Sequence, residues 1–249
     1  MYTKLTKAVE KEIRSLQKRK YRDARRHFAV EGTKMMRELA RAQWPVHHLV
    51  ASETWWGHNA THQVKAQNYW SASPRQLEML SNLRTAPDVI AIVAMPHETP
   101  QLPAFQWAIG LEGIRDPGNM GALLRIADWY AVPQVIATPD TVEVFNPKVV
   151  QASMGSIFRV GVHYRAVEQW PNDTAWLGAH LEGKNAHQHA FAENGLLVIG
   201  SESHGLSSGM LQRVGATVAI PRFGKAESLN AAISAGILLD RLRAQHVPR

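Results

Sequence analysis

Three polar loops hold the residues of this chain that are best suited to chemistry. The loops span residues 115–121, 200–207 and 221–230, and each follows an apolar stretch typical of a buried strand. In parallel sheets, ligands bind where loops leave the carboxyl ends of the strands. The polar side chains in these loops, or on the helix that follows, are Asn119, Arg125, Glu202, Ser228 and Asn230. We interpret them as a set that holds a ligand.

Arg125 is the most informative of these side chains because its neighbours are apolar. Residues 123, 124, 126 and 127 are Leu, Leu, Ile and Ala. An Arg in that setting must find an anion or a dimer partner, since burying it unpaired is costly. A salt bridge to Asp116 or Asp128 is the structural alternative.

Common active-site patterns are missing from the same loops. The glycines between 110 and 121 form no G-x-G-x-x-G, which argues against a dinucleotide-binding oxidoreductase, and no G-x-x-x-x-G-K-[ST] occurs in the sequence. The stretch 200–205 has the wrong spacing for a nucleophile elbow. Ser203 and His204 are adjacent, so we expect their side chains to point apart and exclude a hydrolase.

Histidine and tryptophan gather between residues 44 and 70, and this stretch is the hardest to interpret. A metal site could involve the four histidines His47, His48, His58 and His62. The chain has no Cys, and no carboxylate pair near the histidines completes a ligand set. We therefore expect no metal.

The composition is that of a folded protein with a substantial core. Of the 249 residues, 45% are hydrophobic and 20% are charged, values typical of globular domains. No apolar run reaches the roughly 18 residues of a membrane span. The charged N-terminal segment lacks the apolar core of a secretory signal, and the absence of Cys fits a reducing compartment. We expect a cytoplasmic protein.

Positive charge is concentrated near the N-terminus. The whole chain has a formal net charge of +7, whereas residues 1–41 alone carry thirteen Lys or Arg against five acids. Such a localised block is expected of a surface that contacts a phosphate backbone, and a solvated helix face is the alternative. The candidate nucleic-acid contacts are Arg14, Lys18, Arg19, Lys20, Arg22, Arg25 and Arg26.

Strand and helix patterns alternate along the chain, which indicates an α/β fold. Apolar runs predict strands over 27–31, 46–52, 89–95, 107–114, 134–138, 157–164, 175–183 and 217–220, and another from residue 195. Helical spacing predicts helices over 3–18, 33–42, 74–83, 122–132 and 146–156. Residues 97–105, with two prolines and no periodicity, read as a linker. We predict a small α/β module over 1–100 and a mainly parallel, doubly wound sheet over 106–249.

The stretch 220–239, IPRFGKAESLNAAISAGILL, starts at a strand end and continues into a helix with little side-chain volume on one side. Small residues let another backbone come close, so we expect tight packing here. Ser228 is the expected N-cap of this helix.

The three loops with their flanking elements resemble the three motifs of the SpoU (TrmH-like) family, within the SPOUT superfamily of S-adenosylmethionine-dependent RNA methyltransferases. The matching stretches are RDPGNMGALLRIADWYAV, LLVIGSESHGLS and IPRFGKAESLNAAISAGILL. Together with NPKVVQASMGSIFRV they cover nearly all of 107–242, and residues 18–39 are similar to the family's N-terminal RNA-binding module.

The resemblance implies a Rossmann-like sheet whose C-terminal segment threads a deep trefoil knot, a rare exception to the usual connection rules. It implies S-adenosyl-L-methionine as cofactor, bound by backbone groups at Gly200, Ile220 and Leu229. It also implies a homodimer with the active site near the subunit interface.

The implied reaction is methyl transfer to a ribose 2′-hydroxyl of structured RNA. The globular N-terminal module favours ribosomal RNA over transfer RNA as the substrate. Arg125 matches the family residue placed at the hydroxyl, and Glu202 matches the residue that organises the second motif. Asn119, Ser228 and Asn230 would position Arg125 and the ribose.

Two positions depart from the family pattern. Gln151 stands where Arg is frequent, and Ala131 stands where Gly is common after the first motif helix. These departures leave the positioning of the substrate less determined than the binding of the cofactor. A non-catalytic RNA-binding homologue is the alternative from another class, and the five intact polar residues argue against it.

Overall fold

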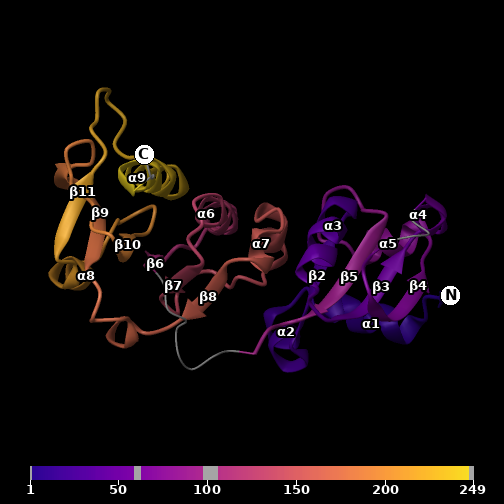
Figure 1. Ribbon diagram of the computed structural model, residues 1–249. Helices are drawn as coiled ribbons and strands as arrows, with labels where there is room; N and C mark the ends of the chain where they lie inside the picture. Colours follow the sequence, from indigo (N-terminus) through magenta and orange to yellow (C-terminus); the bar gives the residue numbers. More distant parts are fainter. Residues whose placement is uncertain (1, 59–62, 98–105, 247–249) are drawn as a thin grey trace. The chain divides into compact units, whose positions relative to one another are not determined.

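The chain forms two compact units in the computed structural model, which describes residues 2–58, 63–97 and 106–246 (Figure 1). The first unit combines Met1–His97 with Phe145–Phe158, and the second combines Glu98–Val144 with Arg159–Arg249. Residues 98–105 of the expected linker 97–105 lie outside the described residues. His62 lies outside them as well.

The first unit is built on a five-stranded mixed sheet. Its strands are β1 (Thr3–Lys4), β2 (His27–Glu31), β3 (Val46–Ala51), β4 (Ala66–Ser71) and β5 (Val89–Ala94), in the order β1-β4-β3-β5-β2. Its helices are α1 (Lys7–Ser15), α2 (Arg19–Arg25), α3 (Thr33–Ala42), α4 (Glu53–His58), α5 (Pro74–Leu80) and α7 (Pro147–Ala152), with a 3₁₀ turn at Ser156–Phe158. The strands β1 and β3 pair with β4 in parallel, whereas β2 and β3 pair with β5 antiparallel. The three strands expected in this region are confirmed as β2, β3 and β5.

One core of the first unit lies between α1, α5 and the sheet. Ile13 of α1 and the following Leu16 are buried with Leu77 of α5 and Ile90 of β5. Burying four such side chains stabilises the unit by about 1.5–3 kcal/mol each relative to leaving them in water. The helix is shorter than expected and begins after Thr6, whose side chain accepts a hydrogen bond from the Val9 N–H.

A segment from the middle of the chain, Phe145–Phe158, packs with the first unit. The rings of Phe145 and Phe28 lie 4.6 Å apart, and those of Phe158 and Trp44 lie 5.3 Å apart. Gly155 has φ +95°, and a Cβ built there would lie 2.6 Å from Cγ of Glu38. The sequence predicted one module over 1–100 and another over 106–249. The segment Phe145–Phe158 comes from the second range but packs with the first unit.

The second unit contains a fully parallel six-stranded sheet. Its strands are β6 (Trp107–Leu111), β7 (Gln134–Ala137), β8 (Gly161–Tyr164), β9 (Trp176–Asn185), β10 (Gly195–Ile199) and β11 (Ala216–Ala219), in the order β11-β9-β10-β6-β7-β8. Its helices are α6 (Pro117–Trp129), α8 (Ser208–Arg213) and α9 (Ala231–His246), with a 3₁₀ turn at Val167–Gln169. Every neighbouring pair is parallel, so the predicted α/β fold with a parallel sheet is confirmed.

The strand order reverses direction between β6 and β10. From β6 the chain continues to β7 and β8 on one side, whereas β9 and β11 lie on the other side of β10. Ile199 at the end of β10 pairs with Leu111 at the end of β6, so the loops after these two strands leave the sheet side by side. Open α/β sheets bind ligands at such a switch point.

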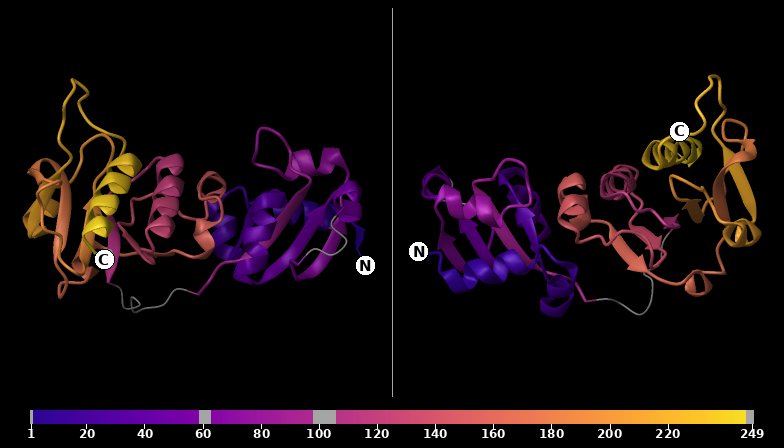
Figure 2. Two further views of the ribbon diagram at one scale, coloured as in Figure 1. Left: turned by 45° about the horizontal axis from the view of Figure 1, so that its top comes forward. Right: turned by 180° about the vertical axis from the view of Figure 1, so that it is seen from behind.

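Helix α9 packs against α6 (Figure 2). Its small residues Ala231, Ala232 and Ala235 are buried, as the expectation of tight packing requires. Across the described ranges, every helix is too short or too polar to cross a membrane.

Candidate active site

Three predicted polar residues from distant parts of the sequence form one hydrogen-bonded chain. Asn119 donates from Nδ2 to Oε1 of Glu202 over 2.6 Å, and Asn230 donates from Nδ2 to Oδ1 of Asn119 over 2.7 Å. Asn230 Oδ1 in turn accepts from the Ala232 N–H over 2.9 Å. A carboxylate only accepts and an amide N–H only donates, so the two ends fix the orientation of both Asn side chains.

Helix α6 begins earlier than the sequence indicates and carries Asn119 in its first turn. Asp116 is the N-cap, accepting from the Asn119 N–H over 2.8 Å, and Pro117 occupies the first helical position. Pro is well suited there because its missing N–H would have no helical partner. The helix therefore holds Asn119 rigidly, whereas the sequence assigned it to a loop.

The N-cap of α9 is Asn230, so the expectation of Ser228 as the cap is wrong. Asn230 Oδ1 accepts from the N–H groups of Ala232 and Ile233, satisfying two donors at the helix start. Ser228 is exposed and lies before the helix begins. The same Asn230 side chain therefore caps α9 and contacts Asn119.

Glu202 projects from a tight loop after β10. Ser201 and Gly205 exchange two backbone hydrogen bonds of 3.1 and 2.9 Å. A Cβ built on Gly200 would lie 2.1 Å from the carbonyl carbon of Gly205, so only Gly permits this approach. The fold-back fixes where Glu202 emerges.

Glu112 is a positioning residue that the sequence did not reveal. It follows β6 directly, and its carboxylate accepts from the Ser207 hydroxyl over 2.6 Å and from the Ser207 N–H over 2.9 Å. Ser207 is also the N-cap of α8. This contact joins the loop after β6 to the loop after β10.

Arg125 points outward from α6 and is exposed. It makes no hydrogen bond or ion pair within the described ranges. Both carboxylates that the sequence offered are occupied elsewhere: Asp116 caps α6, and Asp128 pairs with Arg159 at 2.7 Å. The alternative of a salt bridge to Asp116 or Asp128 is therefore wrong, and the guanidinium is available to an external anion.

Ser203 and His204 contact each other, contrary to the expectation that their side chains point apart. Ser203 Oγ lies 2.7 Å from His204 Nδ1, and both residues are exposed. No carboxylate of the described chain orients this imidazole, so the pair lacks the third member of a hydrolytic triad.

The three expected cofactor-binding positions offer main-chain rather than side-chain groups. Between β11 and α9, residues 220–230 form neither strand nor helix. The main-chain groups of Ile220 and Leu229 find no hydrogen-bond partner in the part of the chain that the structure describes. Unpaired N–H and C=O groups need water or a polar ligand, which fits recognition of an adenosine-containing cofactor by backbone atoms.

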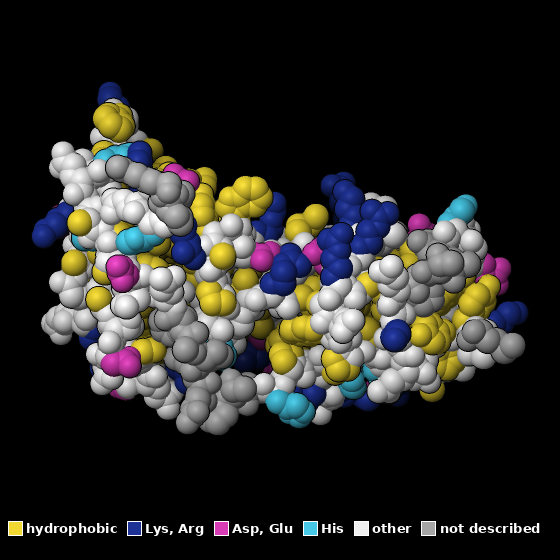
Figure 3. All heavy atoms as spheres, viewed as in Figure 1, with side chains coloured by type: hydrophobic (Ala, Val, Ile, Leu, Met, Phe, Trp, Pro, Cys, Tyr) yellow, Lys and Arg dark blue, Asp and Glu magenta, His cyan; other side chains and the backbone are white. Residues whose placement is uncertain are grey.

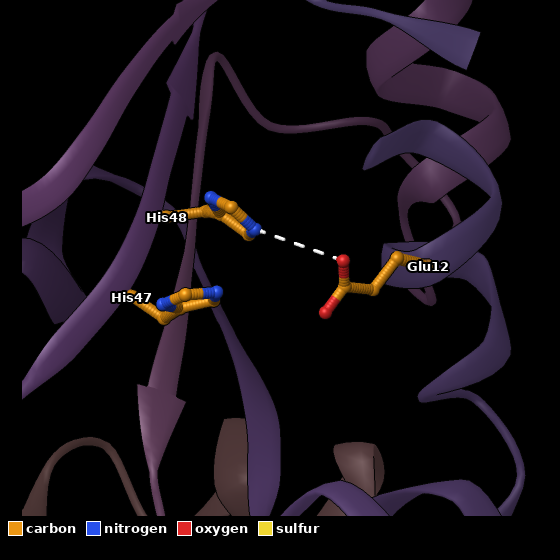
Figure 4. Close-up of side chains that lie close together, drawn as sticks. All are labelled: Glu12, His47 and His48. Carbon is orange, nitrogen blue, oxygen red and sulfur yellow. Dashed lines mark ion pairs between the residues drawn. The ribbon is translucent and has the colours of Figure 1, made fainter. Parts of the chain in front are cut away.

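A second polar cluster, in the first unit, brings together Glu12, His47 and His48 (Figure 4). The pairing register of β3 shifts between Val46 and His48, so the two adjacent histidines lie on one face with ring centroids 4.2 Å apart. A regular strand would place them on opposite faces. Glu12 reaches them from α1, a carboxylate that sequence proximity could not identify.

The donor set of this cluster does not suit a divalent metal. Trp70 Nε1, which can only donate, lies 3.1 Å from His48 Nδ1, so that nitrogen accepts and Nε2 carries the proton. A protonated nitrogen cannot bind a metal, which leaves two ligands in His47 and Glu12. Burial, and then the neighbouring His47 ring, lower the pKa of His48 from 6.5 to about 4.

The basic residues of the first unit separate into buried and exposed groups. Arg22 is only 3% exposed and donates from Nη1 to the carbonyls of Leu16 and Gln17 over 2.9 and 3.0 Å. Arg22 is therefore a structural residue, and its assignment as a nucleic-acid contact is wrong. Lys and Arg side chains also gather over α3 (Figure 3), where Lys34, Arg37 and Arg41 are exposed.

Intramolecular partners engage several of the other cations. Arg19 pairs with Asp23 at 3.4 Å, Arg25 pairs with Glu12 at 3.2 Å, and Arg26 donates to the carbonyl of Pro96 over 2.6 Å. These three remain exposed. Arg14, Lys18 and Lys20 are exposed too, and the Lys20 ammonium lies 4.8 Å from the centre of the Tyr21 ring.

Fold and candidate site together define an α/β protein with a hydrogen-bonded polar cluster at the switch point of a parallel sheet. Residues 106–240 match the SpoU rRNA Methylase family, and residues 9–91 match the MRM3-like substrate binding domain. The first match spans more than half of the chain. The chain belongs to the SpoU rRNA Methylase family, and its cofactor is S-adenosylmethionine.

Relatives are similar over nearly their whole length. The 23S rRNA (guanosine(2553)-2′-O)-methyltransferase RlmP of Bacillus subtilis (strain 168) is 25% identical over 94% of this chain and 95% of that protein. The 23S rRNA (uridine(2479)-2′-O)-methyltransferase of Streptomyces viridochromogenes is 27% identical over 88% of this chain and 83% of that protein.

Solved structures agree with this assignment. The SpoU methyltransferase AviRb from Streptomyces viridochromogenes, in complex with the cofactor AdoMet, has a TM-score of 0.86 at 26% identity, covering 98% of this chain and 100% of that chain. An AdoMet-bound rRNA methyltransferase from Sinorhizobium meliloti also has a TM-score of 0.86 at 26% identity, covering 99% of this chain and 98% of that chain.

Proposed function

We propose that this protein transfers a methyl group from S-adenosylmethionine to a ribose 2′-hydroxyl of ribosomal RNA. The observation that carries the proposal is the hydrogen-bonded chain of Asn119, Glu202 and Asn230 at the switch point. Helix α6, which carries Asn119, also carries Arg125, whose guanidinium has no partner among the described residues. The relatives that act on 23S rRNA favour ribosomal RNA over transfer RNA.

Arg125 is proposed to bind an RNA phosphate and orient the hydroxyl. The bound cofactor supplies an electrophilic methyl group on a sulfonium, which is already a good leaving group, so alignment is the main task of the protein. A free guanidinium is a poor base because its pKa lies above about 12. The hydroxyl proton is therefore expected to leave through the phosphate that Arg125 holds.

Asn119 and Asn230 are proposed to position the ribose from two rigid helix starts. Their hydrogen bonds to each other and to Glu202 leave little freedom to either amide. Glu202 acts as the acceptor that fixes this chain and takes no proton. Ser228, exposed just before α9, is proposed to contact the same ribose.

Main-chain groups at Gly200, Ile220 and Leu229 are proposed to hold the cofactor. The unpaired main chain of Ile220 and Leu229 supports this assignment, as does the fold-back at Gly200. We also propose the trefoil knot for this part of the chain, formed where the segments around these three residues converge.

A homodimer is proposed to form through α6 and α9. These helices expose Trp129, of which 83% is accessible, and Ile233, of which 54% is accessible. Large apolar side chains on two packed helices are typical of an interaction surface. A dimer in the cytoplasm would cover them, and sedimentation or light scattering measures its mass.

The first unit is proposed to bind the RNA backbone. Its candidate contacts are Arg14, Lys18, Arg19, Lys20, Arg25 and Arg26, together with Lys34 and Arg37 of α3. Each phosphate contact that is lost should reduce the steepness with which RNA affinity falls as salt is added.

The test of the proposed function compares Arg125→Ala with the wild type in transfer of a labelled methyl group to unmodified 23S rRNA. Loss of phosphate binding and hydroxyl alignment should slow transfer by about 100-fold, in the range of other positioning and electrostatic contributions. Calorimetric affinity for S-adenosylmethionine should stay unchanged. Mass spectrometry of the product then locates the modified nucleotide.

Arg213→Ala is the matched control, since Arg213 is an exposed Arg of the same unit that pairs with Glu168 on the surface. It should transfer methyl groups like the wild type. A folded Arg125→Ala variant that retains a third of the wild-type rate would contradict the role of Arg125. A wild-type protein that binds no S-adenosylmethionine would support the non-catalytic alternative.

A further inference from the structure

An aromatic side chain lies fully in solvent on the loop that leads to the candidate active site. Phe223 is 96% exposed, more than any other large hydrophobic residue in the described ranges. It lies on the segment between β11 and α9, which projects from these elements (Figure 1). Removing an aromatic ring from water is favourable, so this exposure favours a partner that covers the ring.

Two cations accompany this ring. Arg222 and Lys225 are exposed, and Lys225 makes no hydrogen bond or ion pair with the described residues. Arg222 makes a single long hydrogen bond, of 3.4 Å from Nη1 to the carbonyl of Ala226. The partner therefore has to combine a flat apolar surface with negative charge. A nucleobase flanked by phosphates has both properties, and an apolar protein surface has only the first.

The loop is anchored at its ends and free between them. At one end the Ala186 N–H donates to the carbonyl of Ala219, and at the other Asn230 is held by Asn119. A segment with so few internal hydrogen bonds can adjust to a ligand at low cost. Six residues of chain separate Phe223 from Asn230, so a group that contacts Phe223 lies near the candidate site.

We propose that Phe223 stacks on an unpaired base of the substrate RNA, within a few nucleotides of the methylated ribose. Arg222 and Lys225 contact the phosphates on either side of that base. This inference rests on the proposed function and adds a substrate class to it. A base is free to stack on a side chain only in a single-stranded loop, bulge or end, so the target lies in such a region rather than within a duplex.

The test measures affinity by fluorescence anisotropy for two labelled probes of equal length, a short oligoadenylate and an abasic oligonucleotide. Base–aromatic stacking contributes about 1–3 kcal/mol per base, so the wild type should prefer the oligoadenylate by about tenfold. Phe223→Ala should remove that preference and bind the abasic probe unchanged. Phe223→Trp should retain it, because a larger aromatic ring can still stack.

Leu181→Ala is the matched control, since Leu181 is an exposed apolar residue on β9 of the same unit. It should behave as the wild type with both probes. A Phe223→Ala protein that keeps the tenfold preference overturns the proposal. A Phe223→Ala protein whose affinity falls equally for both probes also overturns it. So does a wild-type protein with equal affinity for the two probes.

Two further measurements separate this inference from the proposed function and from dimerisation. Phe223→Ala should keep the wild-type affinity for S-adenosylmethionine and the wild-type mass in solution. A change of mass would place Phe223 at a subunit interface and overturn the stacking role. A wild-type protein that transfers no methyl group to 23S rRNA contradicts the proposed function. The stacking inference is tested separately, by the base preference measured with the oligonucleotides alone.

Discussion

Each unit of this protein contains one conspicuous polar cluster, and the two differ in which of their atoms are available. The cluster of the first unit, Glu12 with His47 and His48, contains the residue types of metal and acid–base sites. The cluster of the second unit consists of two amides and one carboxylate, Asn119, Asn230 and Glu202, and contains no histidine. Residue type alone would favour the first unit as the place of the chemistry.

The availability of individual atoms favours the second cluster instead. His48 is 4% exposed, and its Nδ1 accepts a hydrogen bond from Trp70 Nε1. Its buried Nε2 has no hydrogen-bond partner in the described part of the chain and lies 4.0 Å from a carboxylate oxygen of Glu12. An unsatisfied buried donor costs about 1–3 kcal/mol and gives a substrate no access. In the second unit the hydrogen bonds orient both amides, and Arg125, nearby along α6, is exposed and has no partner among the described residues. Accessible, oriented atoms therefore favour the second cluster as the candidate site.

The largest expected effect is the loss of cofactor affinity on adding a side chain at Gly200 in the second unit. In Gly200→Ala the new Cβ would overlap the main chain of Gly205, so the loop that carries Glu202 must refold. Calorimetry should find S-adenosylmethionine affinity reduced more than 100-fold, because the main-chain contacts proposed for the cofactor depend on this loop.

Gly209→Ala is the control, since the nearest atom to its added Cβ would be Ser207 Oγ at 3.9 Å. It should bind the cofactor normally. If Gly200→Ala also binds normally, the fold-back does not shape the cofactor site, and the contrast between the two clusters loses its strongest support.

Reversing one hydrogen bond tests whether the second cluster works as a unit. Asn119→Asp places a carboxylate against Glu202, where the amide donated over 2.6 Å, and like charges at that distance repel. The methyl-transfer rate should fall about 10- to 100-fold. Adding Glu202→Gln supplies an amide that can donate to the new carboxylate, so the double variant should recover at least part of the rate. A double variant no faster than Asn119→Asp would show that the hydrogen-bonded chain does not set the rate.

The sequence predicted the strands better than the contacts between distant residues. Strands β6, β7 and β10 are buried on both faces and read as continuous apolar runs, which sequence patterns show well. Helix α2 was missed because it is almost entirely polar, and the single residue it buries is Arg22. Its guanidinium caps carbonyls of the preceding turn, a role that charge counting cannot distinguish from RNA binding.

For the candidate site, the sequence indicated residues and not their geometry. Motif resemblance identified Asn119, Glu202 and Asn230, but the direction of their hydrogen bonds follows from groups at each end that no pattern reveals. The first cluster depends on the register shift beside His48 and on Glu12 of another helix. Such juxtapositions arise from tertiary packing, and a single sequence contains no direct record of them.

Acid should weaken the first unit through His48, whose pKa is about 4 in the folded protein and 6.5 in the unfolded chain. The unfolded chain binds the proton more readily, so stability is fully present above pH 6.5 and is lost as pH falls toward 4. The unfolding free energy should fall by roughly 1–3 kcal/mol over this pH range. His48→Asn keeps an acceptor for Trp70 Nε1 and cannot be protonated, so its unfolding free energy should change less over this range.

Urea unfolding at several pH values measures this dependence. His204→Asn is the control from the second unit, because His204 is exposed and should leave the pH dependence as in the wild type. An unchanged slope in His48→Asn would mean that another group, such as His27, whose pKa is also lowered by burial, governs acid sensitivity.

The smallest expected effect compares one strained helix end from each unit. Gln43 ends α3 with φ +57°, and Ala131 follows α6 with φ +52°, a left-handed conformation that costs a non-Gly residue about 1–2 kcal/mol. Gln43→Gly and Ala131→Gly remove that cost, partly offset by the greater freedom of Gly in the unfolded chain, and each should gain up to about 1 kcal/mol. At Ala131 the gain requires the carbonyl to keep accepting a hydrogen bond from Arg243 Nη2 over 3.0 Å.

Thermal unfolding measures these gains and distinguishes two behaviours. If the units unfold separately, each variant shifts the transition of its own unit. If the chain unfolds cooperatively, both variants shift a single transition equally. A loss of stability in either variant would contradict strain as the description of that helix end.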